Sequence, residues 1–189
     1  MHSSPSLRMI SFVVITLGLG LTIVCAVPVR QPPPANAPAS ITVEISSPEH
    51  FRRRVLAIDQ GFLVVVNNVS AAPVRVWRDW CSWGYQQLSF EITDDAGHSW
   101  TVRRKEHEFF KNYPDYWTLG PGEPLVLSIA LTTDLWESPE SGGGLPIADL
   151  KGKAVTMRAI FAASEDDQSR ENSVWNGRVN STARIYELE

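Results

Sequence analysis

A length of 189 residues provides for one domain and a leader, and the net charge of −4 lacks the basic excess of general nucleic-acid binders. Hydrophobic residues make up 43% of the chain and charged residues 20%, an ordinary balance for a globular protein. A domain of about 150 residues buries enough surface to hold a core without disulfides. We therefore expect a self-sufficient folded domain and no nucleic-acid partner.

The N-terminal residues 1–26 have the pattern of a secretory signal peptide. Arg8 supplies a positive charge, a long uncharged apolar run follows, and small residues precede a cut after Ala26. An uncleaved membrane-anchor helix is an alternative, because a span needs about 17–25 apolar residues. Lipidation of Cys25 is a third interpretation, which the bulky Val24 before it disfavours. All three predict a periplasmic or extracellular domain, anchored to the inner membrane if the leader stays attached.

A proline-rich linker is expected over residues 27–39. Its prolines remove amide donors and bias the chain towards polyproline II, so the segment is typical of a semi-rigid spacer. These prolines are Pro28, Pro32, Pro33, Pro34 and Pro38. A proline motif that binds another protein is the alternative interpretation.

Residues 40–189 have the strand and turn pattern of an all-β domain. Apolar and polar residues alternate in short runs separated by turn sequences such as Asp95-Ala96-Gly97, which is typical of half-buried strands. The expected strands cover residues 41–45, 55–58, 62–66, 74–76, 88–92, 100–102, 125–131, 155–161 and 179–185. About eight or nine strands without a convincing helix predict an antiparallel β-sandwich, with a closed barrel as the alternative. The longest irregular connection is expected over residues 134–153.

Several segments together resemble uncharacterised secreted bacterial proteins with an immunoglobulin-like β-sandwich domain. They are Asn67–Ser70, Pro73–Trp77, the hairpin around Gly97, Leu119–Glu123 and Val174–Ser181. The resemblance implies an immunoglobulin-like sandwich over almost the whole domain and brings no catalytic residues. The chain departs from antibody-type domains because Cys81 is its only cysteine outside the leader, so the paired intersheet cysteines are missing.

A surplus of aromatic residues marks the candidate binding site. The candidate residues are Trp77, Trp80, Trp83, Tyr85 and Trp117. If Val74 and Val76 face the core, strand alternation turns Trp77 outward with Arg75. Exposed aromatic rings beside polar groups are typical of protein and sugar recognition. Packing of the same rings in the core or against loops is the competing interpretation.

Cys81 has three interpretations. An odd cysteine in an exported protein is a buried, inert thiol, a reactive thiol, or one half of a disulfide between two chains, and its aromatic neighbours favour burial. A thiol nucleophile also needs a base, and His50, His98 and His107 all lie far from Cys81 in the sequence. The sequence has no paired cysteine or histidine spacing of the zinc kind, and acidic turns such as Asp94-Asp95 are typical of solvated loops. We therefore expect no catalytic residue, no metal and no cofactor.

Three functions follow from these observations. The leading hypothesis is a non-enzymatic, exported interaction module of the cell envelope that binds a protein partner through loops at one end of the sandwich. The alternative is a carbohydrate-binding module that stacks sugars on exposed tryptophans. A cysteine-dependent hydrolase built on Cys81 is the third. The expected partner is thus a protein or a glycan at the envelope, and membrane contact is expected only through the N-terminal segment.

Overall fold

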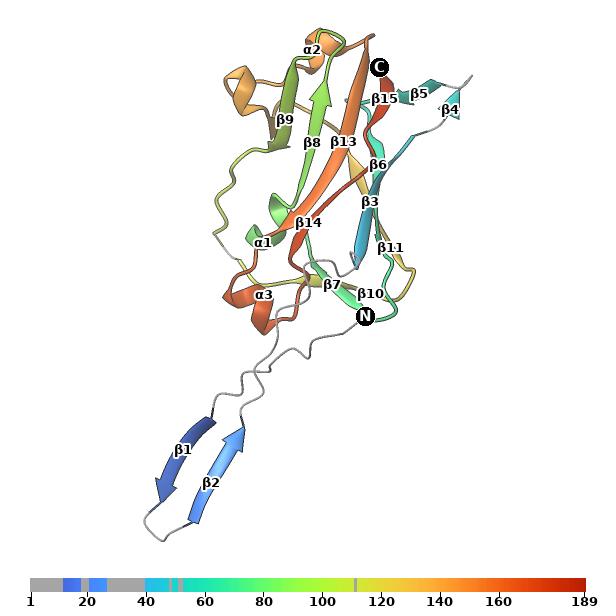
Figure 1. The fold of residues 1–189 in the computed structure, drawn as a ribbon. Helices are drawn as coiled ribbons and strands as arrows, with labels where there is room; N and C mark the ends of the chain where they lie inside the picture. Colours follow the sequence, from blue (N-terminus) through green and yellow to red (C-terminus); the bar gives the residue numbers. More distant parts are fainter. Residues whose placement is uncertain (1–11, 18–20, 27–39, 48, 51–52, 111) are drawn as a thin grey trace, which may run out of the picture. The chain divides into compact units, whose positions relative to one another are not determined.

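The structure is a computed structural model, which describes residues 12–17, 21–26, 40–47, 49–50, 53–110 and 112–189. The chain divides into two compact units, Met1–Pro38 and Ala39–Glu189. Figure 1 traces both units and labels their elements.

The N-terminal unit contains one hairpin. Strands β1 (Phe12–Leu17) and β2 (Leu21–Ala26) pair antiparallel over their whole length. The described residues of the segment expected to be a signal or anchor helix are therefore strands. Within the described part of the chain, no helix has the length and apolar character needed to cross a bilayer. The linker over 27–39 lies outside the described residues, and cleavage, anchoring and lipidation stay predictions.

Among its described residues, the regular structure of the second unit is mostly β-strand. Three strands form one antiparallel sheet in the order β11-β6-β3: β3 (Ile41–Ser46), β6 (Phe62–Asn68) and β11 (Pro124–Ile129). A second sheet has the order β12-β9-β8-β13-β15-β5-β4, and β14 also pairs with β13. Its strands are β4 (Glu49–His50), β5 (Arg53–Leu56), β8 (Leu88–Thr93), β9 (Ser99–Arg104), β12 (Trp136–Glu137), β13 (Ala154–Ala163), β14 (Gly177–Asn180) and β15 (Arg184–Leu188). All pairs are antiparallel except β15 with β5.

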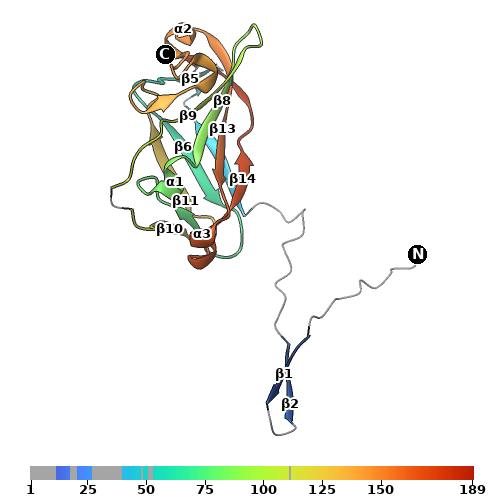
Figure 2. The ribbon, with the colours of Figure 1, turned by 90° about the vertical axis from the view of Figure 1, so that its left-hand side faces the viewer.

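A short third sheet and four single-turn helices complete the unit. The short sheet pairs β7 (Val74–Trp77) with β10 (Tyr116–Leu119). The helices are α1 (Ser82–Tyr85), η1 (Pro139–Ser141), α2 (Ile147–Leu150) and α3 (Asp167–Glu171). Figure 2 shows α1, α3 and β10 towards one end of the unit and α2 at the other. Hence the connection expected to be irregular over 134–153 contains β12, η1 and α2.

The core lies between the three-stranded sheet and the larger sheet. Val43 and Val64 contribute from the first, and Phe90 and Met157 from the second, all in one buried cluster. The Phe62 ring of β6 meets the Phe90 ring of β8 edge to face, with centroids 5.5 Å apart. Alternating apolar side chains of two facing sheets thus meet in one layer, which confirms the prediction of an all-β, sandwich-like fold.

The prediction of a single strand over residues 179–185 is wrong. The strand breaks at Ser181, and the chain forms two strands, β14 and β15, instead. The Ser181 amide donates to the Ala159 carbonyl at 2.8 Å, and the Ser181 hydroxyl accepts from the Ala159 amide at 2.9 Å. A side-chain oxygen therefore replaces a backbone carbonyl at the break. The short helices α1, η1 and α3 were also not expected, and α3 forms because Asp166 and Ser169 build a capping box at its N-terminus.

Asn68 is a fully buried polar residue at the end of β6. Its side-chain amide nitrogen, Nδ2, donates to the carbonyls of Ala72, Leu119 and Gly120 at 2.8–3.0 Å. Its side-chain oxygen accepts from the amide and the hydroxyl of Ser70. One side chain thus fixes the corner between β6 and β7 and ties it to the turn between β10 and β11.

Replacing Asn68 by alanine is expected to lower the free energy of unfolding by about 3 kcal/mol, because several buried carbonyls lose their donor. Urea unfolding measures this difference. Asn67→Ala is the matched control on the same strand: Asn67 is only partly buried, and its side chain makes no hydrogen bond to the described residues. Equal losses for the two variants would show that the Asn68 contacts do not stabilise the corner.

Candidate functional site

The stretch around β7 organises one end of the domain, which we call the aromatic end: β7, β10, α1 and residues 105–115 between β9 and β10. The register places Trp77 opposite Tyr116 and Val76 opposite Trp117. Because paired residues of antiparallel strands share a face, the two faces of this short sheet carry different aromatic groups. The site therefore has two sides.

On one face, Trp77 is 1% exposed and packs with Cys81 and Val174 in a small second core. Tyr116 and the partly buried Trp83 cover it, with ring centroids 6.3 Å and 5.7 Å from the Trp77 ring. The expectation that Trp77 points outward into solvent is wrong. Strand alternation does turn Trp77 away from Val76, which lies in the large core. However, α1 and Val174 cover the face on which Trp77 lies. The Trp175 amide donates to the Arg75 carbonyl at 2.8 Å and holds this covering segment on β7.

Gly84 allows α1 to lie close to the end of β7. A Cβ atom at this position would be 2.1 Å from the Arg78 carbonyl oxygen and 2.9 Å from the Trp77 Cβ. The backbone amides of Gly84 and Tyr85 both donate to the Cys81 carbonyl. The helix thus depends on a residue without a side chain, and its position brings Trp83 onto Trp77.

On the other face, the Arg78 guanidinium lies between two tryptophans. Its central carbon is 3.6 Å from the centroid of the Trp117 ring and 4.5 Å from that of Trp80. The Arg78 Nε lies 3.3 Å from the Asp115 carboxylate. The two tryptophan rings stand edge to face at 69°, and Trp80 is 54% exposed. Cation–π attraction and the ion pair therefore hold an arginine and a tryptophan at the surface in a defined arrangement.

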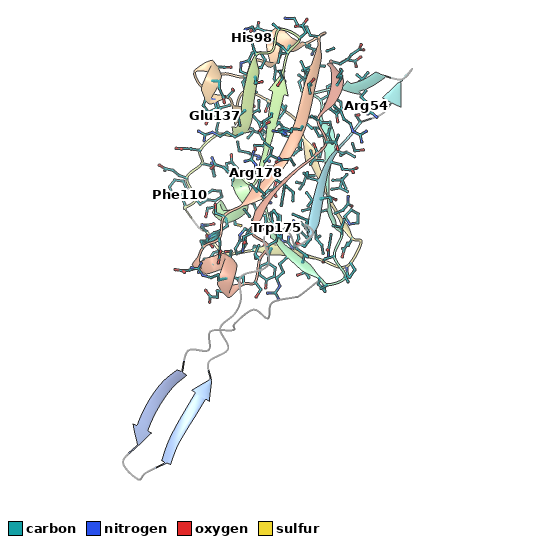
Figure 3. All side chains as sticks on the ribbon, in the orientation of Figure 1. Arg54, His98, Phe110, Glu137, Trp175 and Arg178 are labelled. Carbon is teal, nitrogen blue, oxygen red and sulfur yellow. The ribbon has the colours of Figure 1, made fainter. Side chains whose placement is uncertain are left out.

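The loop over residues 105–115 carries the two most exposed aromatic side chains that the structure describes. Phe110 is 94% exposed and Tyr113 is 75% exposed, and Figure 3 shows Phe110 at the outer side of the loop. The loop is attached to α1 by two hydrogen bonds between Asn112 and Ser82.

A second attachment is an aromatic cluster in which Tyr85, His107 and Phe109 pack with ring centroids 4.9–5.5 Å apart. The exposed rings thus project from a loop that is fixed at several points.

The five candidate residues of the sequence do not form one surface. Trp80 and Trp117 meet around Arg78, Trp77 and Trp83 pack together, and Tyr85 joins the cluster under the loop. Four residues of the site were not among these candidates: Arg78, Phe109, Phe110 and Tyr113. The density of aromatic residues over 107–117 was the available signal for the two phenylalanines.

Cys81 is buried, which confirms the interpretation of an enclosed thiol. Its sulfur donates to the carbonyls of Arg78 at 3.2 Å and Asp115 at 3.6 Å. His98 contacts Asp94 at 3.0 Å, and His107 packs in the aromatic cluster. Among the described residues there is no group of three or more His, Cys, Asp and Glu side chains that could hold a metal ion.

Replacing Gly84 by alanine is expected to lower the free energy of unfolding by about 3 kcal/mol, because the methyl group overlaps the Arg78 carbonyl. Thermal unfolding and tryptophan fluorescence measure the loss and the displacement of α1. Gly144→Ala is the matched control, since a Cβ atom there meets nothing closer than 3.5 Å. Unchanged stability of the Gly84 variant would contradict the packing of α1 against β7.

The Cys81 thiol is expected to react with iodoacetamide at least about 100-fold more slowly in the native protein than in urea, because it is buried. Peptide mass mapping distinguishes its alkylation from that of Cys25. Rapid alkylation of Cys81 in the native state would instead indicate an accessible nucleophile.

Comparison of the sequence with protein-family models found no matching family. Comparison with curated proteins likewise found no relative of this chain. The resemblance to immunoglobulin-like secreted proteins therefore stays a prediction, and the function has to be argued from the site itself.

Proposed function

We propose that this chain is a non-enzymatic interaction module that is exported from the cytoplasm and binds a protein partner through its aromatic end. The observation that carries the proposal is the exposure of Phe110, Tyr113 and Trp80 at 94%, 75% and 54%. Large aromatic side chains at the surface are the residues that contribute most to protein–protein binding energy. A function in binding accounts for the exposure of three large aromatic side chains at one end of the domain.

The attachment of these rings supports recognition of a folded or extended protein surface. Asn112 bonds to α1, and Arg78 lies between Trp80 and Trp117, so part of the entropy cost of ordering the surface is met before binding. Arg78 and Asp115 add a charged pair beside the apolar rings. Aromatic residues with arginine are the composition typical of interface hot spots.

The same geometry argues against a flat tryptophan platform for sugars at this position. Trp77 is buried, and Trp80 stands edge to face with Trp117 instead of lying in one plane with it. The burial of the Cys81 thiol argues against the hydrolase. A protein partner is therefore the hypothesis that the aromatic end supports best.

We also propose that the domain is an immunoglobulin-like module. Two facing sheets with the recognition loops gathered at one end support this assignment. The leader over residues 1–26 supports export, and the linker over 27–39 supports a domain held at a distance from the membrane if the leader is retained.

Affinity capture from an envelope extract, quantified by mass spectrometry, tests the binding proposal. A triple variant with alanine at Phe110, Tyr113 and Trp80 is expected to retain less than about one tenth of a partner that the wild type enriches. Its melting temperature is expected to stay close to that of the wild type, because these side chains are exposed.

The matched control is Ile185→Ala, which removes an apolar side chain that is 66% exposed on β15. This variant is expected to retain the partner. Loss of the partner in the control to the same degree, or its full retention by the triple variant, would contradict recognition through the aromatic end.

A further inference from the structure

A groove of about 780 Å³ lies beside α1, on the side of Trp83. Its walls come from α1, the end of β13, the segment leading to α3 and the start of β14. Neither Trp80 nor Phe110 nor Tyr113 lines it. Its volume falls within the range of about 300–1,000 Å³ that is typical of small-molecule sites. The groove is therefore a second candidate site, separate from the surface proposed to bind a protein.

The apolar part of the groove is a tryptophan that is held in position. Trp83 is partly buried, and its ring packs on the buried Trp77 with centroids 5.7 Å apart and planes tilted by 32°. Trp77 also lines the groove. Because the Trp83 ring already packs on Trp77, it loses little side-chain entropy when a ligand binds to its other face.

The polar part of the groove combines groups of different character. Asn176 is exposed and makes no hydrogen bond to the described residues, so its amide is available as donor and acceptor. Arg178, labelled on β14 in Figure 3, has a 3.6 Å contact with Glu91. Two carboxylates also line the groove: Glu165 pairs with Arg170, and Asp166 caps α3. A wall with an amide, a cation and two carboxylates carries both signs of charge and selects against a ligand with a large charge of one sign.

Gln87 adds an unsatisfied acceptor. Its amide nitrogen donates to the Trp77 carbonyl at 2.8 Å, which fixes the orientation of the amide. Its Oε1 is buried and receives no hydrogen bond from the described residues. Gln87 lines both this groove and a smaller cavity of about 120 Å³ next to β11. A buried acceptor without a donor is unfavourable, so Gln87 is a point of unmet hydrogen-bonding capacity between the two cavities.

We propose that this groove binds a neutral oligosaccharide. A sugar ring presents an apolar C–H face to a tryptophan and hydroxyl groups that both donate and accept hydrogen bonds. The Trp83 ring matches the first property, and Asn176, Arg178 and Glu165 match the second. The sugar carries no net charge, in keeping with the mixed signs of the wall. The proposal assigns Trp83 to sugar stacking and leaves Trp80 with the protein surface.

A printed array of neutral and acidic glycans, probed with the full chain, gives the first test. At least one neutral glycan is expected to bind, and the corresponding soluble oligosaccharide is then titrated by calorimetry. Retention of no neutral glycan, or of acidic glycans alone, would overturn the proposal.

Variants locate the site. Trp83→Ala is expected to raise the Kd at least about 10-fold and Asn176→Ala about 3-fold, from the loss of stacking and of a hydrogen bond. Asn176→Trp is expected to block the groove; position 176 is exposed and outside the regular elements, so neither Asn176 variant depends on a core contact. Trp80→Ala is the matched tryptophan control and is expected to change the Kd by less than about 2-fold. Binding that persists in both Asn176 variants, or falls equally in the Trp80 variant, would place the sugar elsewhere and overturn the assignment.

Discussion

The packing of Trp77 between β7 and the segments that cover it determines the geometry of the whole aromatic end. Gly84 brings α1 close enough for Trp83 to cover this ring, and Val174 closes the same small core. Burying a tryptophan removes a large apolar surface from water, so these segments gain more from covering the ring than from an independent arrangement. The two surfaces proposed for recognition then lie on either side of this contact.

Arg78 follows Trp77 directly, and strand alternation turns it to the opposite face, where Trp117 lies. A residue buried for stability thus sets the direction of its neighbour, which is exposed. On the first face, Trp83 is fixed by the same burial and remains partly accessible to the groove. The stability of this end and both proposed binding surfaces depend on one tryptophan, so changes at position 77 cannot separate these effects. Changes at Trp80 and Asn176 address each proposed surface alone.

Alternation of apolar residues predicted most strands and the sandwich-like layering, because period two is a strong signal wherever one face is buried. It also predicted the orientation of Trp77 relative to Val76. Alternation did not predict that Trp77 is buried, since residues 174–175, which cover it, lie about a hundred positions away in the sequence. Single-turn helices such as α1 are too short to show a helical period, and the break at Ser181 depends on one hydroxyl. The groove joins four separate segments and has no local signature.

The buried amide of Asn68 has a consequence for expression of the protein. Asn68-Val69-Ser70 is an acceptor sequence for N-linked glycosylation, and a modified Asn68 amide can no longer donate to three carbonyls. In a eukaryotic secretory host, modification of the nascent chain before folding would keep the β6–β7 corner open. The exposed Asn180, in a second acceptor sequence, would tolerate a glycan far better. A bacterial host avoids this competition between processing and folding.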